Sequence, residues 1–244
     1  EQTIDGYVKS FSLKYIDWAN PKKNVFHVSD EFSVSRVKSK QTRRPDVVIF
    51  VNGIPLSIIE CKRPDLKNAL DEAVSQQLRN QREESEIPYL FTFSQTLLAV
   101  CQNNAKYATC GTDKDFWSIW KEDLRSGNEQ YFNEQLDRLV NQPLSGEDIS
   151  RIKSSREAEL HDDIQILCTM ERMASLQDKA IYSLLSPQRL LTLTYRYIVF
   201  DNNVKKIARY QQYFAIEKTL KQITSGNGGE KRRGGVIWHT TGSG

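Results

Sequence analysis

The sequence predicts an α/β fold with a mixed β-sheet flanked by helices, followed by a helical segment and a last strand. Three observations predict it. Two apolar runs, at residues 46–51 and 54–62, enclose Asn52-Gly53, which is typical of a β-hairpin. Residues 68–82 then carry apolar side chains at helical spacing. Two further apolar runs, at residues 89–93 and 96–101, follow that segment, and this order is that of a sheet with helices on its faces.

The remaining elements of the first half are assigned in chain order. A strand is expected within residues 24–34, and the basic residues 38–44 are expected to form a loop. Pro64 ends the hairpin and Pro88 ends the helix that follows it. Another strand is expected at residues 106–110, and the aromatic residues 116–120 are expected to pack at the edge of the sheet.

The pattern becomes helical after about residue 130. We expect helices at residues 131–140, 162–185, 187–197 and 205–224, because Pro187 suits a first helical position and the other segments are long and periodic. Residues 225–235 are rich in glycine and basic residues and predict a loop. Residues 235–238 resemble the beginning of a buried strand.

The composition is that of an ordinary globular protein. The chain has 244 residues, of which 39% are hydrophobic and 27% charged, and its formal net charge is only +3. No apolar run is long enough to cross a membrane, and no secretory leader is recognised. Four scattered cysteines without metal-ligand spacing favour a reducing, cytoplasmic location.

Three charged residues interrupt the apolar hairpin. Asp46 begins its first strand, and Glu60 and Lys62 end its second, where they share one face because strand side chains alternate. Buried charges are unfavourable unless they are paired or bind a metal. Two carboxylates and the backbone carbonyl of Cys61 provide hard oxygen ligands for Mg²⁺, which activates water for phosphodiester hydrolysis. Lys62 would orient that water or stabilise the developing charge.

This interpretation requires a particular hairpin register. A plain two-residue turn at Asn52-Gly53 pairs Val51 with Ile54 and places Asp46 opposite Ile59, on the other face from Glu60. A shared site therefore predicts a bulged turn, for example the three-residue loop Val51-Asn52-Gly53 with a left-handed glycine.

The alternative is that these charges are structural. An acid-x-Lys triplet is common by chance, and Asp46 and Glu60 would also suit a salt-bridged edge strand. The chain contains a second such triplet, Asp65-Leu66-Lys67 after Pro64, which we interpret as solvated. The spacing alone leaves the catalytic and structural interpretations equally open.

The stretch from Arg43 to Lys62 closely resembles the nuclease core of type I restriction enzyme R subunits, members of the PD-(D/E)xK nuclease superfamily. The resemblance implies that Asp46 and Glu60 bind the metal and that Lys62 is catalytic. The family often adds a helical Gln-x-x-x-Tyr motif, which Gln76 matches, whereas Asn80 replaces the tyrosine. Gln76 is therefore a fourth candidate catalytic residue, and a solvent-facing polar stripe is the alternative.

The end of the chain resembles the beginning of an ATP-driven motor. An apolar strand leads into Thr241, Gly242, Ser243 and Gly244, which is similar to a phosphate-binding loop without its lysine. Upstream, Gln212, or alternatively Gln211, matches the glutamine that recognises adenine in related helicase-like motors; an ordinary amphipathic helix is the other interpretation. Because the lysine is missing, this chain is not expected to use ATP itself.

Together these resemblances predict three regions: a PD-(D/E)xK endonuclease domain (1–130), a helical connector (131–204) and the start of a RecA-like motor domain (205–244). They imply a Mg²⁺- and ATP-dependent DNA endonuclease that acts on double-stranded DNA with methyltransferase (M) and specificity (S) subunits. The alternatives are the nuclease domain of a repair or recombination helicase–nuclease and a non-catalytic docking module. The basic segments 38–44 and 231–233 either contact phosphates or form solvated loops.

Overall fold

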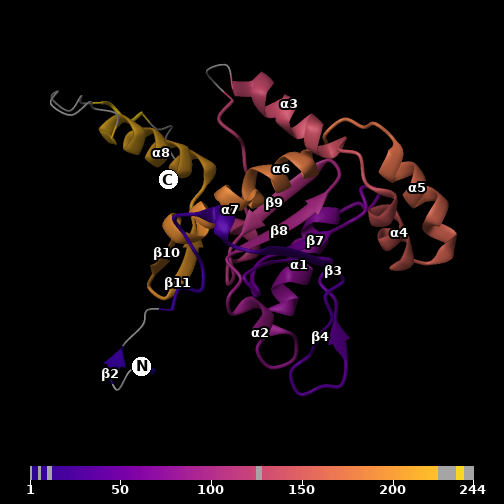
Figure 1. Cartoon of the computed structure of the whole chain (residues 1–244), viewed down its shortest axis with the longest axis horizontal. Helices are drawn as coiled ribbons and strands as arrows, with labels where there is room; N and C mark the ends of the chain where they lie inside the picture. The colour runs from indigo at the N-terminus through magenta and orange to yellow at the C-terminus, as the bar shows by residue number, and fades with distance from the viewer. Residues whose placement is uncertain (1, 5–6, 10–12, 125–127, 225–234, 239–244) are drawn as a thin grey trace.

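A five-stranded mixed sheet occupies the centre of the computed structural model, which describes residues 2–4, 7–9, 13–124, 128–224 and 235–238 (Figure 1). The strand order is β3-β6-β7-β8-β9, with β7 and β8 parallel and the other neighbours antiparallel. This sheet confirms the predicted α/β class. The strands are β3 (Phe26–Asp30), β6 (Val47–Val51), β7 (Ile54–Cys61), β8 (Thr96–Cys101) and β9 (Asn104–Ala108).

The β6–β7 hairpin corrects the predicted turn. Val51 pairs with Ile54, so the turn is the plain two-residue one, with positive φ at Asn52 (50°) and Gly53 (83°) as a type I′ turn requires. The register shifts further along, where Phe50 pairs with Pro55 but Ile49 pairs with Ser57. Leu56 is therefore the extra residue of a β-bulge. The register shift that a shared site requires is present, but it lies within β7 rather than at the turn.

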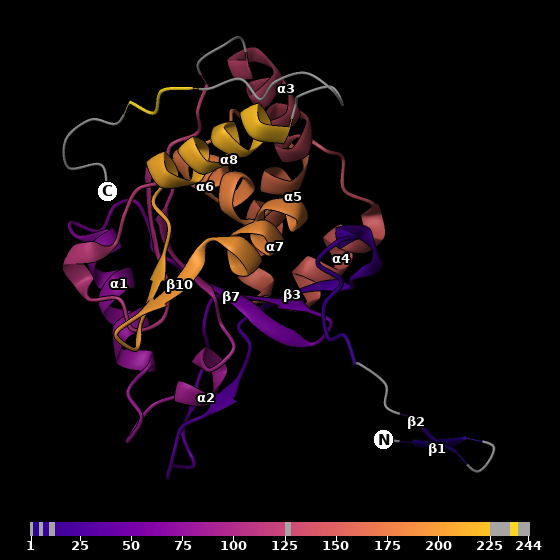
Figure 2. The ribbon, with the colours of Figure 1, turned by 90° about the vertical axis from the view of Figure 1, so that its left-hand side faces the viewer.

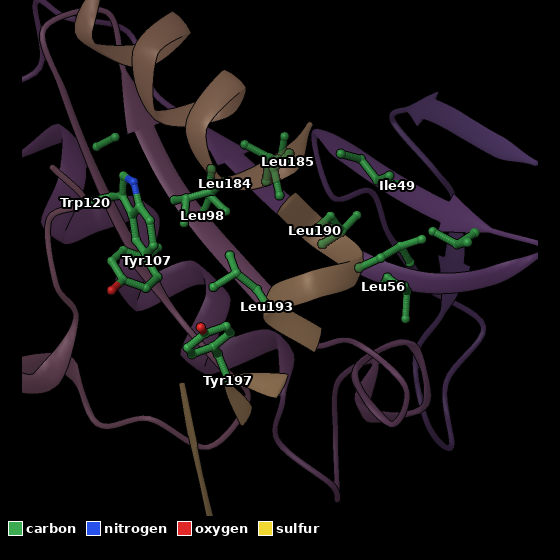
Figure 3. Close-up of a cluster of buried hydrophobic side chains, with 14 of the residues drawn as sticks. Ile49, Leu56, Leu98, Tyr107, Trp120, Leu184, Leu185, Leu190, Leu193 and Tyr197 are labelled. Carbon is green, nitrogen blue, oxygen red and sulfur yellow. The ribbon is translucent and has the colours of Figure 1, made fainter. Parts of the chain in front are cut away.

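Each face of the sheet has its own apolar core. One face packs against α1 (Ala69–Asn80), whose Ala73 and Val74 meet Val48 and Ile58. The other face packs against α6 (Leu176–Leu185) and α7 (Pro187–Arg196). Figure 3 shows the leucines of these two helices directed at the sheet. Because Leu56 belongs to the second core and Ile58 to the first, the bulge exchanges the faces of the residues that follow it.

Among the described residues, the remaining strands form three separate two-stranded sheets, β1-β2, β4-β5 and β10-β11. Figure 2 shows the helices of the second half above strands β7 and β3, with α2 below them. The short strands are β1 (Gln2–Ile4), β2 (Tyr7–Lys9), β4 (Val34–Ser35), β5 (Thr42–Arg43), β10 (Ile198–Asp201) and β11 (Val204–Ile207). The other helices are α2 (Pro88–Phe91), α3 (Asn128–Val140), α4 (Gly146–Ser154), α5 (His161–Thr169), α8 (Tyr210–Thr224) and the 3₁₀ turns Pro21–Lys23, Lys114–Phe116 and Ala158–Leu160.

Three predicted elements of the sequence differ in the structure. The strand expected at 89–93 is the helix α2, because Pro88 occupies its first turn. The helix expected at 162–185 is two helices, and the second begins at a capping box between Ser175 and Asp178. The helix expected from residue 205 starts at Tyr210, because a turn at Asn202 and Asn203 with positive φ forms the hairpin β10–β11.

The predicted strand at 235–238 is also absent from this structure. These four residues lie outside any helix or strand, and Trp238 is 91% exposed. A buried strand needs neighbours that satisfy its N–H and C=O groups, and the described part of the chain offers none there. No helix in the described residues is long and apolar enough to cross a membrane.

Candidate functional site

Asp46 and Glu60 lie across from each other at one end of the β6–β7 hairpin. Val47 pairs with Ile59, so Asp46 continues that register to Glu60. The backbone N–H of Glu31 donates to the carbonyl of Asp46 at 2.9 Å, which keeps Asp46 in line with the strand. Glu60 lies two residues after Ile58 in β7, so the two side chains share one face of the sheet. Because Ile58 packs against α1, Glu60 faces α1 as well. Without the bulge at Leu56, Glu60 would lie on the opposite face.

Hydrogen bonds connect Glu60, Lys62 and Gln76, and Asp46 is bonded to the backbone between Glu60 and Lys62. Oδ2 of Asp46 accepts from the backbone N–H of Cys61 at 2.6 Å. Gln76, on α1, donates through Nε2 to Oε1 of Glu60 and accepts through Oε1 from Nζ of Lys62 at 2.7 Å. Nζ of Lys62 also lies 3.7 Å from Oε1 of Glu60. The amide of Gln76 thus bridges an acid and a base, with a donor for one and an acceptor for the other.

Glu60 is electrostatically unusual. Its side chain is fully buried, and its Oε2 has no hydrogen-bond partner among the described residues. Burial, and after it the charge of Asp46, raise the pKa of Glu60 to about 8, although Lys62 and Arg79 oppose the shift. A buried carboxylate with a free oxygen beside a second carboxylate is the arrangement that a divalent cation would relieve.

The donor set fits a Mg²⁺ ion. Asp46 and Glu60 provide carboxylate oxygens, and Mg²⁺ in proteins is often held by one or two carboxylates with water completing its shell. The N–H of Cys61 points towards Asp46, so its carbonyl points to the same side, because both groups of a strand residue do. The thiol of Cys61 packs on the other face, and burial raises its pKa to about 11, so the carbonyl is the available donor. Within the described residues, no group of three or more His, Cys, Asp or Glu side chains forms a metal cluster.

The helical motif is buried rather than solvent-facing. Gln76 is half-buried against Glu60 and Lys62, and Asn80 is only 2% exposed. The alternative of a solvated polar stripe is therefore wrong. The second acid-x-Lys triplet behaves as expected, because Asp65 is exposed and pairs with Arg63 in solvent.

Sequence reasoning overlooked Arg79. Its charge lowers the pKa of two buried carboxylates, Glu60 and Glu86. Its Nε is buried without a partner in the described part of the chain. The signal was its position three residues after Gln76, which puts both on one helix face.

The predicted nucleotide-binding residues are only partly described. The side-chain oxygen of Gln212 accepts from the backbone N–H of Arg209 at 2.9 Å and so caps the start of α8. The buried oxygen of Gln211 has no partner among the described residues. Thr241, Gly242, Ser243 and Gly244 lie outside the residues that the structure describes.

Comparison with known proteins finds one family match in the first half of the chain and another at its end. Residues 3–116 match the family described as the type I restriction enzyme R protein N terminus, and residues 211–244 match the SWI2/SNF2 ATPase family. A Methanocaldococcus jannaschii protein, named as a candidate endonuclease subunit of the type I restriction enzyme MjaIXP, is 26% identical over 98% of this chain. The endonuclease subunit of the Haemophilus influenzae type I restriction enzyme HindI is 26% identical over all of it.

A third relative, the SauCOLORF180P endonuclease subunit of Staphylococcus aureus, is 23% identical over 95% of this chain. The chain spans about a fifth of the length of these relatives: 21%, 20% and 19% of the three proteins. The family matches follow the order of the chain and agree with the resemblances at its hairpin and at its end. The chain therefore resembles type I restriction enzyme R subunits, first in their N-terminal region and then at the start of a SWI2/SNF2 ATPase region.

Proposed function

We propose that this chain carries the Mg²⁺-dependent nuclease site of a type I restriction enzyme, which hydrolyses DNA phosphodiester bonds. The observation that carries the proposal is the pairing of Asp46 with Glu60 across the bulged hairpin, with one oxygen of the buried Glu60 left without a partner. An ordinary salt-bridged strand edge would not bury a carboxylate whose pKa is raised to about 8.

Each residue has a defined task in this proposal. Mg²⁺, when bound, polarises the phosphate and lowers the pKa of water. Asp46, Glu60 and the carbonyl of Cys61 hold it. Lys62 orients the attacking water or stabilises charge on the phosphate. Gln76 fixes Lys62 relative to Glu60 through its two hydrogen bonds.

The wider assembly is part of the same proposal. In the full protein, cleavage would be coupled to ATP-driven translocation along double-stranded DNA, with Gln212 and the loop at 241–244 contributing to the ATP site. Methyltransferase (M) and specificity (S) subunits would select the DNA site, in the cytoplasm. The proposal also includes the division of the chain into an endonuclease domain (1–130), a helical connector (131–204) and the start of the motor domain (205–244). The match to R proteins favours this assembly over a repair helicase–nuclease.

Calorimetric titration with Mg²⁺ tests the site directly. The unaltered chain is expected to bind, and Asp46→Ala and Glu60→Ala are each expected to abolish binding. Asp65→Ala is the matched control, because it removes an exposed carboxylate from the similar triplet nearby. Absent binding, or binding that survives both site substitutions, would make the cluster structural and favour a docking module.

A further inference from the structure

The hairpin β4–β5 concentrates positive charge directly before Asp46. Residues 32–45 contain five basic side chains and no acidic one, whereas the net charge of the whole chain is only +3. The positive charge of this segment therefore exceeds that of the entire chain. The hairpin extends from the sheet next to α2 (Figure 1). Its basic residues are Arg36, Lys38, Lys40, Arg43 and Arg44.

Glu86 fixes this hairpin to the loop after α1. Arg43 donates to both oxygens of Glu86, at 2.7 and 3.0 Å, and Arg36 reaches Oε1 at 3.3 Å. The backbone N–H of Val37 donates to the carbonyl of Glu86 at 2.8 Å. At the base of the hairpin, the ring of Phe32 packs edge-on against Phe50 of β6. The hairpin is thus held in place before any partner arrives.

The fixed hairpin leaves cations unpaired. One carboxylate, Glu86, serves two guanidinium groups. Lys38, Lys40 and Arg44 are exposed and form no ion pair with any residue that the structure describes. Unpaired cations that are held close together repel one another, and an anionic partner would lower that electrostatic energy.

Arg79 extends this charge to the candidate active site. Its charge lowers the pKa of Glu60 in the candidate site and the pKa of Glu86 at the anchor of the hairpin. Its buried Nε lacks a partner within the described residues. Lys62, Arg79 and the basic side chains of the hairpin are thus the cations of the candidate site and of the segment that precedes it.

We infer that the β4–β5 hairpin is a preformed arm that binds the phosphate backbone of double-stranded DNA beside the cleavage site. The inference rests on the proposed nuclease function, because a nuclease must hold the DNA backbone next to Asp46 in order to cut it. Lysines and arginines on a rigid hairpin contact phosphates without reading bases, which suits a subunit that does not select the sequence.

Fluorescence anisotropy with a short labelled duplex, in EDTA, tests the arm without cleavage. Lys38→Ala/Lys40→Ala is expected to weaken binding and to reduce the slope of log K against log salt by roughly 1.8, or about 0.9 per lost phosphate contact. Arg79→Ala is expected to weaken binding as well. The control is Lys22→Ala/Lys23→Ala, which removes the same charge from exposed lysines on the 3₁₀ turn at Pro21–Lys23 and should leave affinity and slope unchanged.

The outcomes separate the arm from the nuclease site. Equal affinity and slope in the two double variants, or no duplex binding by the unaltered chain, overturns the arm. Arm-dependent binding of polyglutamate without binding of DNA overturns it too, in favour of an acidic protein partner. Failure of Mg²⁺ binding together with arm-dependent DNA binding would instead refute only the catalytic site.

Discussion

The carboxylate of Asp46 accepts a hydrogen bond from the backbone N–H of Cys61 at 2.6 Å. Cys61 separates Glu60 from Lys62, so this bond positions the first acid of the candidate site against the strand that carries the other two residues. The bond is possible because the bulge at Leu56 brings Asp46 into register with Glu60. The site thus depends on a backbone irregularity as much as on the residues themselves.

Removing the bridge between Lys62 and Glu60 should weaken metal binding. In Gln76→Ala, both hydrogen bonds of the amide are lost. Residues that support ligands typically contribute 10- to 100-fold to metal affinity, so we expect a loss of about that size by calorimetry with Mg²⁺. Ser75→Ala changes the neighbouring exposed position of α1 and should bind as the unaltered chain does. Equal affinities for both variants would remove Gln76 from the site.

The pH dependence of stability should reveal the buried acid. The pKa of Glu60 is raised from 4.5 to about 8, so the folded chain binds this proton more tightly than the unfolded chain. The resulting stabilisation is complete below about pH 4.5 and is lost as the pH rises towards 8. The difference between the two pKa values corresponds to roughly 5 kcal/mol as an upper bound.

Urea unfolding of the unaltered chain and of Glu60→Gln across this pH range provides the measurement. The glutamine variant is expected to lack that loss, because it cannot ionise. Added Mg²⁺ should offset the loss in the unaltered chain, since the cation favours the ionised carboxylate, and apparent Mg²⁺ affinity should rise with pH up to about 8. Parallel pH profiles for the two proteins would argue against a raised pKa at Glu60.

Restoring the tyrosine of the family motif should destabilise this chain. Asn80 is only 2% exposed, and a tyrosine there would overpack the interior, which typically costs about 1–3 kcal/mol. Thermal or urea unfolding of Asn80→Tyr is expected to show this loss. Asn80→Ala, which adds no volume, separates overpacking from loss of the amide. An Asn80→Tyr chain as stable as the unaltered one would show that the site retains room for the ring.

The β6–β7 turn should tolerate a side chain poorly at Gly53. Its φ is 83°, although a Cβ there would meet no atom within 4 Å, so only backbone strain opposes alanine. We expect Gly53→Ala to destabilise the chain by about 1 kcal/mol. Gly146→Ala is the control, because Gly146 begins α4, also has open space and has no positive φ. A similar free energy of unfolding for both variants would contradict this account.

The sequence by itself determined the central hairpin, α1, β8, the α/β class and the resemblance to restriction enzyme R subunits. These features depend on local patterns: alternating apolar residues around Asn52-Gly53, helical spacing after Pro64, and the grouping of Asp46, Glu60 and Lys62. The resemblance to the family's helical motif indicated Gln76 as a further candidate residue of the site. The same reasoning failed at Tyr89–Phe93, where Pro88 favours a helix start over the strand propensity of the aromatic residues.

Only the tertiary structure decided which face each charge occupies. The shared site required a register shift, but the sequence could not place it at Leu56. The position of the bulge depends on which side chains of β7 pack into the core on each face of the sheet. The burial of Glu60, the effect of the Arg79 charge on its pKa and the attachment of the basic hairpin to Glu86 involve residues far apart in the chain. Their electrostatics depend on distance and solvent exclusion, which no local pattern encodes.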